Sequence, residues 1–166
     1  MKKILTLGVL AFMAISTVSC TSKLETKTET EVVTVDNDKI KTDIEGMETA
    51  YAQALNERNL DGIMAYYAED AETYEGGQEP MIGKANIRKS IENQLKMMPA
   101  GMKIGFETKN LMISSDGAQV VENGSYKVTD TTNAEISSGS FMAAFKKNGE
   151  KYECVREMIV SNKKTQ

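Results

Sequence analysis

The side chains of this sequence best placed to do chemistry are hydroxyls and carboxylates. The chain contains no histidine. That absence excludes serine–histidine triads and histidine-ligated metal sites. Tyr51 offers a phenol hydroxyl within an apolar helical pattern, and Glu75 and Glu157 offer carboxylates within alternating segments. A carboxylate buried among apolar side chains has a raised pKa, which is a common property of functional sites.

Each of these residues also has a structural interpretation that the sequence leaves open. Tyr51 lies on the apolar stripe of its helix, where a tyrosine with a satisfied hydroxyl is ordinary core. Glu75 precedes Gly76-Gly77 and could be a solvated carboxylate at a strand end. Arg156 and Glu157 could form a surface salt bridge or a cross-strand pair.

The remaining reactive side chains indicate no metal site and no cofactor. Cys154 lies in the alternating segment KYECVREMIV and is expected to be a small buried residue, since no histidine could activate it. Of the 11 methionines, Met47, Met64 and Met98 fall on helical stripes with leucine and isoleucine, which is typical of core filling, and Met1 and Met13 belong to the predicted signal. The sequence contains no phosphate-binding glycine loop and no carboxylate cluster at metal-ligand spacing.

The first 38 residues indicate export and anchoring. Lys2 and Lys3 precede an apolar run, and residues 1–19 are predicted to be a signal peptide. Cys20 follows small residues at a position that resembles the bacterial lipobox, although Thr17 departs from that pattern. We therefore expect lipidation at Cys20 and a location in the bacterial cell envelope, periplasmic or at the outer membrane; ordinary secretion and an incidental cysteine remain the alternatives.

Residues 21–38, rich in Thr, Lys and Glu, are predicted to be a flexible tether, and residues 39–163 a single domain. The full chain has 20 basic and 24 acidic residues, and without the two lysines of the signal its net charge is −6. This charge argues against nucleic acid and against an anionic bilayer surface as partners.

The domain divides into a helical part and a strand-rich part. Apolar spacing predicts a helix over 43–58, a second short helix capped by Asn59 that carries Leu60, Ile63, Met64 and Tyr67, and a third from Gly83 to Pro99. Strands are predicted near 71–75 and at 102–114, 119–130, 135–147 and 151–161. Three helices followed by an antiparallel meander predict an α+β fold in which a curved sheet wraps around the first helices.

Two segments carry a resemblance to a known superfamily, YAQALNERNLDGIMAYYAEDAETYEGGQEP (51–80) and KKNGEKYECVREMIVSN (146–162). They resemble the nuclear transport factor 2-like superfamily, in particular its SnoaL-like and ketosteroid isomerase-like members. The resemblance implies a cone-shaped α+β barrel with an apolar cavity. It also implies an enzyme or a non-enzyme, because the superfamily contains both.

The same resemblance implies a set of site residues. It places Tyr51 where ketosteroid isomerases carry an oxyanion-binding tyrosine, and Glu75 where they carry the general base. The position of their second oxyanion donor falls near Phe141, where this chain has no carboxyl group. Losing one such donor typically costs about 2.7 to 4 kcal/mol, which argues against steroid isomerisation at the family's efficiency.

The register of the resemblance also implies which side chains line the cavity. On the last strand Val155, Glu157 and Ile159 are expected to face inward, while Tyr152, Cys154 and Met158 pack away from the cavity. Among the neighbouring tyrosines, Tyr67 and Tyr74 are expected at the mouth.

Three functions remain open at this point. The first is a lipid-anchored domain that binds a small apolar or carbonyl-containing molecule without chemistry. The second is an isomerase-, dehydratase- or cyclase-type enzyme with Glu75 as base and Tyr51 as donor. The third is a protein-interaction module that forms a homodimer through the convex face of its sheet.

Overall fold

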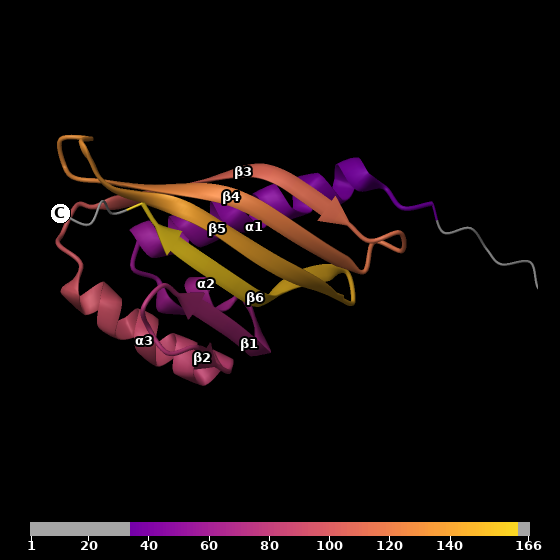
Figure 1. The fold of residues 1–166 in the computed structure, drawn as a ribbon, viewed down its shortest axis with the longest axis horizontal. Coiled ribbons are helices and arrows are strands. Elements are labelled where there is room, and N and C mark those ends of the chain that lie inside the picture. Colours follow the sequence, from indigo (N-terminus) through magenta and orange to yellow (C-terminus); the bar gives the residue numbers. More distant parts are fainter. Residues whose placement is uncertain (1–33, 163–166) are drawn as a thin grey trace, which may run out of the picture. The chain divides into compact units, whose positions relative to one another are not determined.

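The computed structural model describes residues 34–162, so the predicted signal peptide, Cys20 and most of the predicted tether lie outside the described residues. Figure 1 shows a curved sheet with helices along one side. The helices are α1 (Asn37–Asn56), α2 (Leu60–Met64) and α3 (Lys84–Met97). The strands are β1 (Tyr67–Glu75), β2 (Met81–Ile82), β3 (Lys103–Ile113), β4 (Gln119–Thr129), β5 (Glu135–Asn148) and β6 (Lys151–Ser161).

Helix α1 begins earlier than the apolar stripe predicts. The carboxylate of Asp36 accepts a hydrogen bond from the backbone N–H of Lys39 at 2.9 Å, which caps the helix at Asn37 rather than near residue 43. The end of the predicted tether is therefore part of the helix. Buried residues recur three or four positions apart along it: Ile40, Ile44, Glu48, Tyr51 and Ala54.

The short helix α2 is capped as predicted, because the side chain of Asn59 accepts from the N–H of Gly62 at 3.0 Å. The prediction that this helix carries Tyr67 is wrong. The helix ends at Met64, and the backbone carbonyl of Tyr66 accepts from the N–H of Cys154 at 2.9 Å, so the chain pairs with β6 from this point. Tyr67 is the first residue of β1.

Helix α3 lies between two backbone breaks. Gly83 precedes it with φ of 85°, in the left-handed region that favours glycine. The helix ends at Met97. The next residue, Met98, has an extended backbone, because the residue before a proline, here Pro99, is driven out of helical conformation. In residues 34–162, no helix combines the length and apolar character that crossing a membrane requires.

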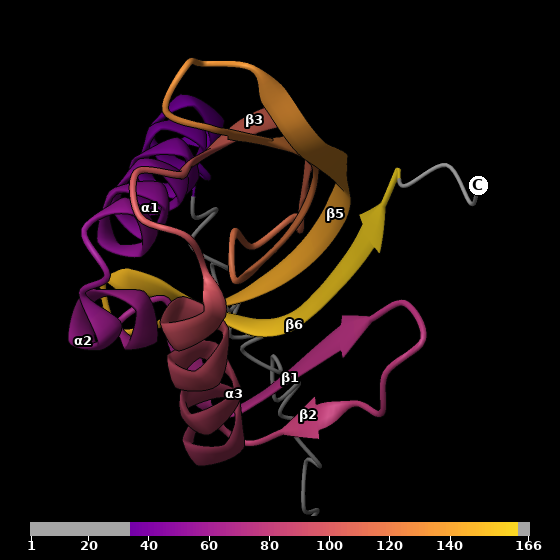
Figure 2. The same cartoon turned by 90° about the vertical axis from the view of Figure 1, so that its left-hand side faces the viewer.

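The sheet has six strands in the order β2-β1-β6-β5-β4-β3. Strands β3 to β6 form the predicted antiparallel meander, with ends within one residue of the predicted bounds. Strand β1 is parallel to β6 and begins at Tyr67, earlier than the predicted 71. Figure 2 shows the sheet curving around the side on which the three helices lie, which is the expected cone-shaped α+β fold.

Candidate ligand-binding site

A cavity of about 130 Å³ lies between α1, α3 and the concave face of the sheet. Most of its wall is apolar, with Leu55 from α1, Ile87 and Ile91 from α3, and Phe106 and Ile159 from the strands. The polar residues that line it are Tyr51, Tyr67, Thr73, Glu75, Gln94, Tyr126 and Glu157. An apolar cavity with a few convergent polar groups is the usual form of a small-molecule site.

The structure brings six of the predicted site residues together at this cavity and leaves two outside it. Those that line it are Tyr51, Tyr67, Glu75, Phe141, Glu157 and Ile159. Tyr74 and Val155 do not belong to its lining. The positions of these two residues follow from the geometry of their strands.

Val155 lies at an irregularity of β6. Its neighbours pair with consecutive residues of β5, Cys154 with Phe145 and Arg156 with Ala144, so Val155 is an extra residue on its strand. Such a bulge shifts the alternation of side chains. As a result Cys154 and Glu157 both face the interior. The expectation that Val155 lines the cavity is therefore wrong. Tyr152 and Cys154 are buried core residues outside the cavity lining.

Tyr74 lies on the opposite face of β1 from the cavity. Thr73 and Glu75 face inward, and side chains alternate along a strand, so Tyr74 points to the convex side. There its hydroxyl donates to Oε2 of Glu72 at 2.5 Å, and Glu72 also pairs with the guanidinium of Arg156 at 3.0 Å. The expectation that Tyr74 lines the cavity mouth is wrong for this reason.

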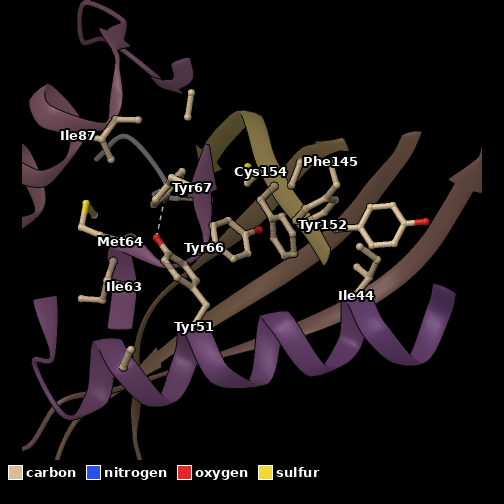
Figure 3. Packing of buried hydrophobic residues seen from close by; sticks show 14 of the residues in the cluster. Ile44, Tyr51, Ile63, Met64, Tyr66, Tyr67, Ile87, Phe145, Tyr152 and Cys154 are labelled. Carbon is tan, nitrogen blue, oxygen red and sulfur yellow. Dashed lines mark hydrogen bonds between the residues drawn. The ribbon is translucent and has the colours of Figure 1, made fainter. Parts of the chain in front are cut away.

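Three buried side chains form a hydrogen-bonded chain into the cavity. The hydroxyls of Tyr51 and Tyr67 lie 2.7 Å apart, a contact drawn in Figure 3, and the Tyr67 hydroxyl donates to Oε2 of Glu157 at 2.7 Å. When Glu157 is ionised, Tyr67 gives its single proton to that carboxylate, so Tyr51 is the donor in the bond between the tyrosines. The proton of each tyrosine is therefore used within the chain.

Burial controls the ionisation of this chain. Desolvation raises the pKa of Glu157 from 4.5 to about 7, against the opposing effect of the Tyr67 hydrogen bond, and the charges of Glu75 and Glu122 raise the pKa further. The pKa values of Tyr51 and Tyr67 are also raised well above 10, first by burial and then by the charge of Glu157. Both tyrosines are therefore neutral at physiological pH, while Glu157 can gain or lose a proton there.

Glu75 stands near the end of β1 and is held by amides. Gln78 donates to its Oε2 at 2.8 Å and Gln94 donates to its Oε1 at 3.3 Å. Gln94 lies on α3 and also lines the cavity, so it fixes the carboxylate at the cavity wall. Glu75 is thus neither a freely solvated carboxylate nor a fully buried one.

Phe141 occupies the place where the resemblance expects a second acid. Its ring packs edge-on against Phe106 at 5.6 Å between centroids. Gly124 faces it on β4, and a Cβ at Gly124 would lie 2.3 Å from the Phe141 ring, so glycine makes the room that this ring requires. The cavity wall at this point is aromatic and offers no proton.

Thr73 is a cavity residue that the sequence reasoning missed. It is 3% exposed, and its Oγ1 has no hydrogen-bond partner among residues 34–162. Its signal was the alternation of β1, in which Ala71, Thr73 and Glu75 share one face. Threonine is common in strands for its shape alone, so the type of residue gave no indication of a site.

A second buried polar group, Glu48 and Glu122, was also missed. Tyr66 donates to Oε1 of Glu48 at 2.5 Å and Thr108 donates to Oε1 of Glu122 at 2.6 Å, while Oε2 of Glu122 has no hydrogen-bond partner among the described residues. Burial, followed by the charge of Glu122, raises the pKa of Glu48 to about 9, so Glu48 is protonated at neutral pH. The signal for both was their position, Glu48 on the apolar stripe of α1 and Glu122 between Val120 and Gly124 on an inward face.

Cys154 and the acidic side chains offer no metal site within residues 34–162. No group of three or more metal-binding side chains lies together in that part of the chain. Cys154 is buried in the core beside Tyr66, as Figure 3 shows, and burial raises the pKa of its thiol well above 9. A thiol that stays protonated is a weak nucleophile.

The family follows from comparison with known sequences. The SnoaL-like domain model matches residues 49–153, which is more than half of the chain, and the chain therefore belongs to the SnoaL-like domain family. This fold often binds small molecules or acts as an isomerase. No curated protein matches the sequence significantly.

Solved structures of low sequence identity share the fold. A ketosteroid isomerase-like protein from Erwinia carotovora atroseptica matches with a TM-score of 0.62 and 14% identity, over 78% of this chain and 100% of that one. A nuclear transport factor 2-like protein of unknown function from Pseudomonas putida matches with a TM-score of 0.65 and 17% identity, over 78% and 91%. At these identities the likeness shows the fold alone, which is the nuclear transport factor 2-like, ketosteroid isomerase-like fold predicted from the sequence.

Proposed function

We propose that this protein is a lipid-anchored domain of the bacterial cell envelope that binds a small, largely apolar molecule in its cavity. The observation that carries the proposal is the cavity itself, about 130 Å³ in volume, apolar over most of its wall and reached by the buried carboxyl of Glu157. Burying a carboxyl group costs stability unless it is hydrogen-bonded, and among the described residues only the Tyr67 side chain donates to Glu157.

Binding without chemistry fits the hydrogen bonds better than catalysis does. An oxyanion hole needs donors that are free to bind the developing charge. The proton of Tyr51 goes to Tyr67 and that of Tyr67 goes to Glu157, so neither hydroxyl is free to bind a substrate carbonyl. The place of the second donor is taken by the ring of Phe141.

The anchoring part of the proposal depends on Cys20 and the apolar run before it. Several acyl chains on one cysteine give stable membrane attachment, because each buried CH₂ contributes about 0.8 kcal/mol. The segment between Cys20 and α1 would then hold the cavity away from the bilayer.

The experiment is purification of the full chain from its native membrane in mild detergent, followed by mass spectrometry of the small molecules released on denaturation. A recurrent compound that is lost when the cavity is filled, for example by Ile159→Phe in its wall, would support binding. Recovery of the same compounds from wild type and the filled variant would refute it.

Catalysis remains the alternative because Glu75 and Glu157 line one cavity. Incubation of wild type and Glu75→Gln with a set of carbonyl compounds separates the two functions. Turnover by wild type that is lost in Glu75→Gln, with binding retained, would establish an enzyme with Glu75 as base. Binding by both proteins without turnover would support the proposal.

A second candidate function is a homodimer formed through the convex face of the sheet, and exposed apolar side chains on that face favour it. Met142 and Met158 are neighbours on β5 and β6, 47% and 52% exposed, and Val160 beyond them is 54% exposed. Adjacent exposed apolar side chains on a sheet often mark an interaction surface. Sedimentation of the full chain should show a dimer that Met158→Lys dissociates; a wild-type monomer at all concentrations would refute this second function.

A further inference from the structure

Thr73 has an unused hydroxyl in the wall of the cavity. The residue is 3% exposed, and its Oγ1 has no hydrogen-bond partner within residues 34–162. A buried hydroxyl without a partner is destabilising, and most buried polar atoms in folded proteins are satisfied. A hydroxyl left in this state beside a cavity is placed to bind a ligand.

Thr73 lies directly beside Glu157. The two residues are Cα partners on the parallel strands β1 and β6, and both side chains line the same cavity. Among the described residues, Tyr67 is the single side chain that donates to the Glu157 carboxyl, and it uses Oε2. A hydroxyl and a carboxyl are therefore presented together to one ligand group.

The two tyrosines cannot take the place of Thr73. Their protons are used along the chain from Tyr51 through Tyr67 to Glu157. The Thr73 hydroxyl is a buried donor in this wall that has no partner among the described residues, and it can also accept. When Glu157 is ionised, the complementary ligand group is one that donates to its carboxylate and accepts from the Thr73 hydroxyl.

We propose that Thr73 and Glu157 together bind the hydroxyl of a compact, neutral, single-ring molecule. The O–H of the ligand donates to the Glu157 carboxylate, and its oxygen accepts from Thr73 Oγ1. This inference rests on the proposed binding function and names the ligand class: a phenol-type hydroxyl compound in place of a carbonyl compound.

The size of the cavity and the charge of its wall narrow the class of ligand. The cavity of about 130 Å³ is close to the roughly 150 Å³ of an apolar cavity that holds benzene. A steroid-sized molecule does not fit that volume. Glu75 and Glu157 both line the wall, so an anionic ligand would meet like charge.

The test uses the full chain in lipid nanodiscs, with methyl NMR of the cavity residues Ile87 and Ile159 as the readout. The probes are phenol, benzene, cyclohexanone and benzoate. Phenol should bind about tenfold more tightly than benzene or cyclohexanone, and benzoate should leave the methyl shifts unchanged. Partitioning into lipid is the same for every protein variant, so affinity ratios between variants are unaffected by it.

Thr73→Val is the matched variant, because it keeps the shape and removes the hydroxyl. It should weaken phenol binding by about 3- to 10-fold, which is the usual worth of one hydrogen bond, and leave benzene within about twofold. Thr73→Ser keeps the hydroxyl and should bind phenol within about twofold of wild type, and Thr73→Ala removes the hydroxyl if the valine variant does not fold.

The outcomes separate this inference from the function on which it rests. Equal binding of phenol and benzene, tighter binding of cyclohexanone, or phenol binding unaffected by Thr73→Val would overturn the hydroxyl site and leave the binding function standing. A cavity whose methyl groups respond to none of the probes would overturn both.

Discussion

Tyr67 donates its hydroxyl proton to Oε2 of Glu157 over 2.7 Å, with both side chains almost fully buried. The bond links the first strand to the last at the wall of the cavity. It favours the ionised carboxyl, whereas burial favours the protonated one, and the balance gives a pKa of about 7. The protonation state of Glu157 therefore depends on the hydrogen bond from Tyr67.

Tyr67→Phe should raise the pKa of Glu157 above about 7, because the variant removes the hydrogen bond that lowers it and keeps the burial that raises it. Carboxyl chemical shifts followed against pH by NMR measure the change. Tyr51→Phe is the control, since it leaves the Tyr67–Glu157 bond in place and should shift the pKa less. Equal shifts in both variants would contradict the assigned role of Tyr67.

The stability of the protein should fall as pH rises from about 4.5 to about 7. In this range the unfolded chain has released the proton of Glu157 while the folded chain still holds it, so a higher pH favours unfolding. The difference in unfolding free energy between wild type and Glu157→Gln should decrease across the window by on the order of 3 kcal/mol. Urea denaturation at pH 4, 6 and 8 measures it.

The charge of Glu157 is the smallest of the named causes that raise the pKa of Glu48, so Glu48 contributes nearly alike to both proteins and largely cancels from that difference. Glu79→Gln, a variant of an exposed carboxylate, serves as the control, and its unfolding free energy should change with pH as that of wild type does. Parallel curves for Glu157→Gln as well would mean that the Glu157 carboxyl is not held protonated by the fold.

Glu48→Gln and Glu48→Ala should differ sharply at pH 7. Glu48 is protonated there, so glutamine preserves its neutral shape and its ability to accept from the Tyr66 hydroxyl, and should lie within about 1 kcal/mol of wild type. Alanine leaves the Tyr66 hydroxyl buried without its acceptor and leaves a cavity, and should cost on the order of 3 kcal/mol. Urea unfolding followed by circular dichroism checks both, and an equal loss in the two variants would argue against a protonated Glu48.

Cys20→Ser should remove the protein from the membrane fraction or leave it as an uncleaved precursor, because the thiol is the proposed acylation site. Metabolic labelling with a fatty-acid analogue and membrane fractionation of cells give the result. Mutant protein that has lost its signal and still sediments with membranes would contradict the anchor.

The parts of the fold set by local rules were predictable from sequence. Asn59 marks a helix start through its side-chain hydrogen bond, and Gly83 marks another through its backbone angle. The antiparallel meander follows from the alternation of apolar and polar residues along its strands. The parallel pairing of β1 with β6 depends on contacts between distant residues, which is why the start of β1 and the strand state of Tyr67 were missed.

A residue of the candidate site was predictable where the repeat of a single helix or strand fixes the direction of its side chain. Tyr51 and Glu157 follow from helical spacing and strand alternation. The effect of Glu122 on Glu48 could not be predicted, because it depends on two residues far apart in the sequence lying close together in the fold. Thr73 was missed because its unused hydroxyl is visible only when every neighbour is in place.

The extra residue at Val155 also sets the sign of charge in the cavity. Because side chains on a strand alternate with a period of two, a one-residue slip that removed the bulge would turn Arg156 and Met158 inward and expose Glu157 to solvent. The wall beside Thr73 would then present a fixed cation in place of a titratable acid. An insertion or deletion at this single point is thus a short evolutionary route from a site for neutral hydroxyl compounds to one for anions.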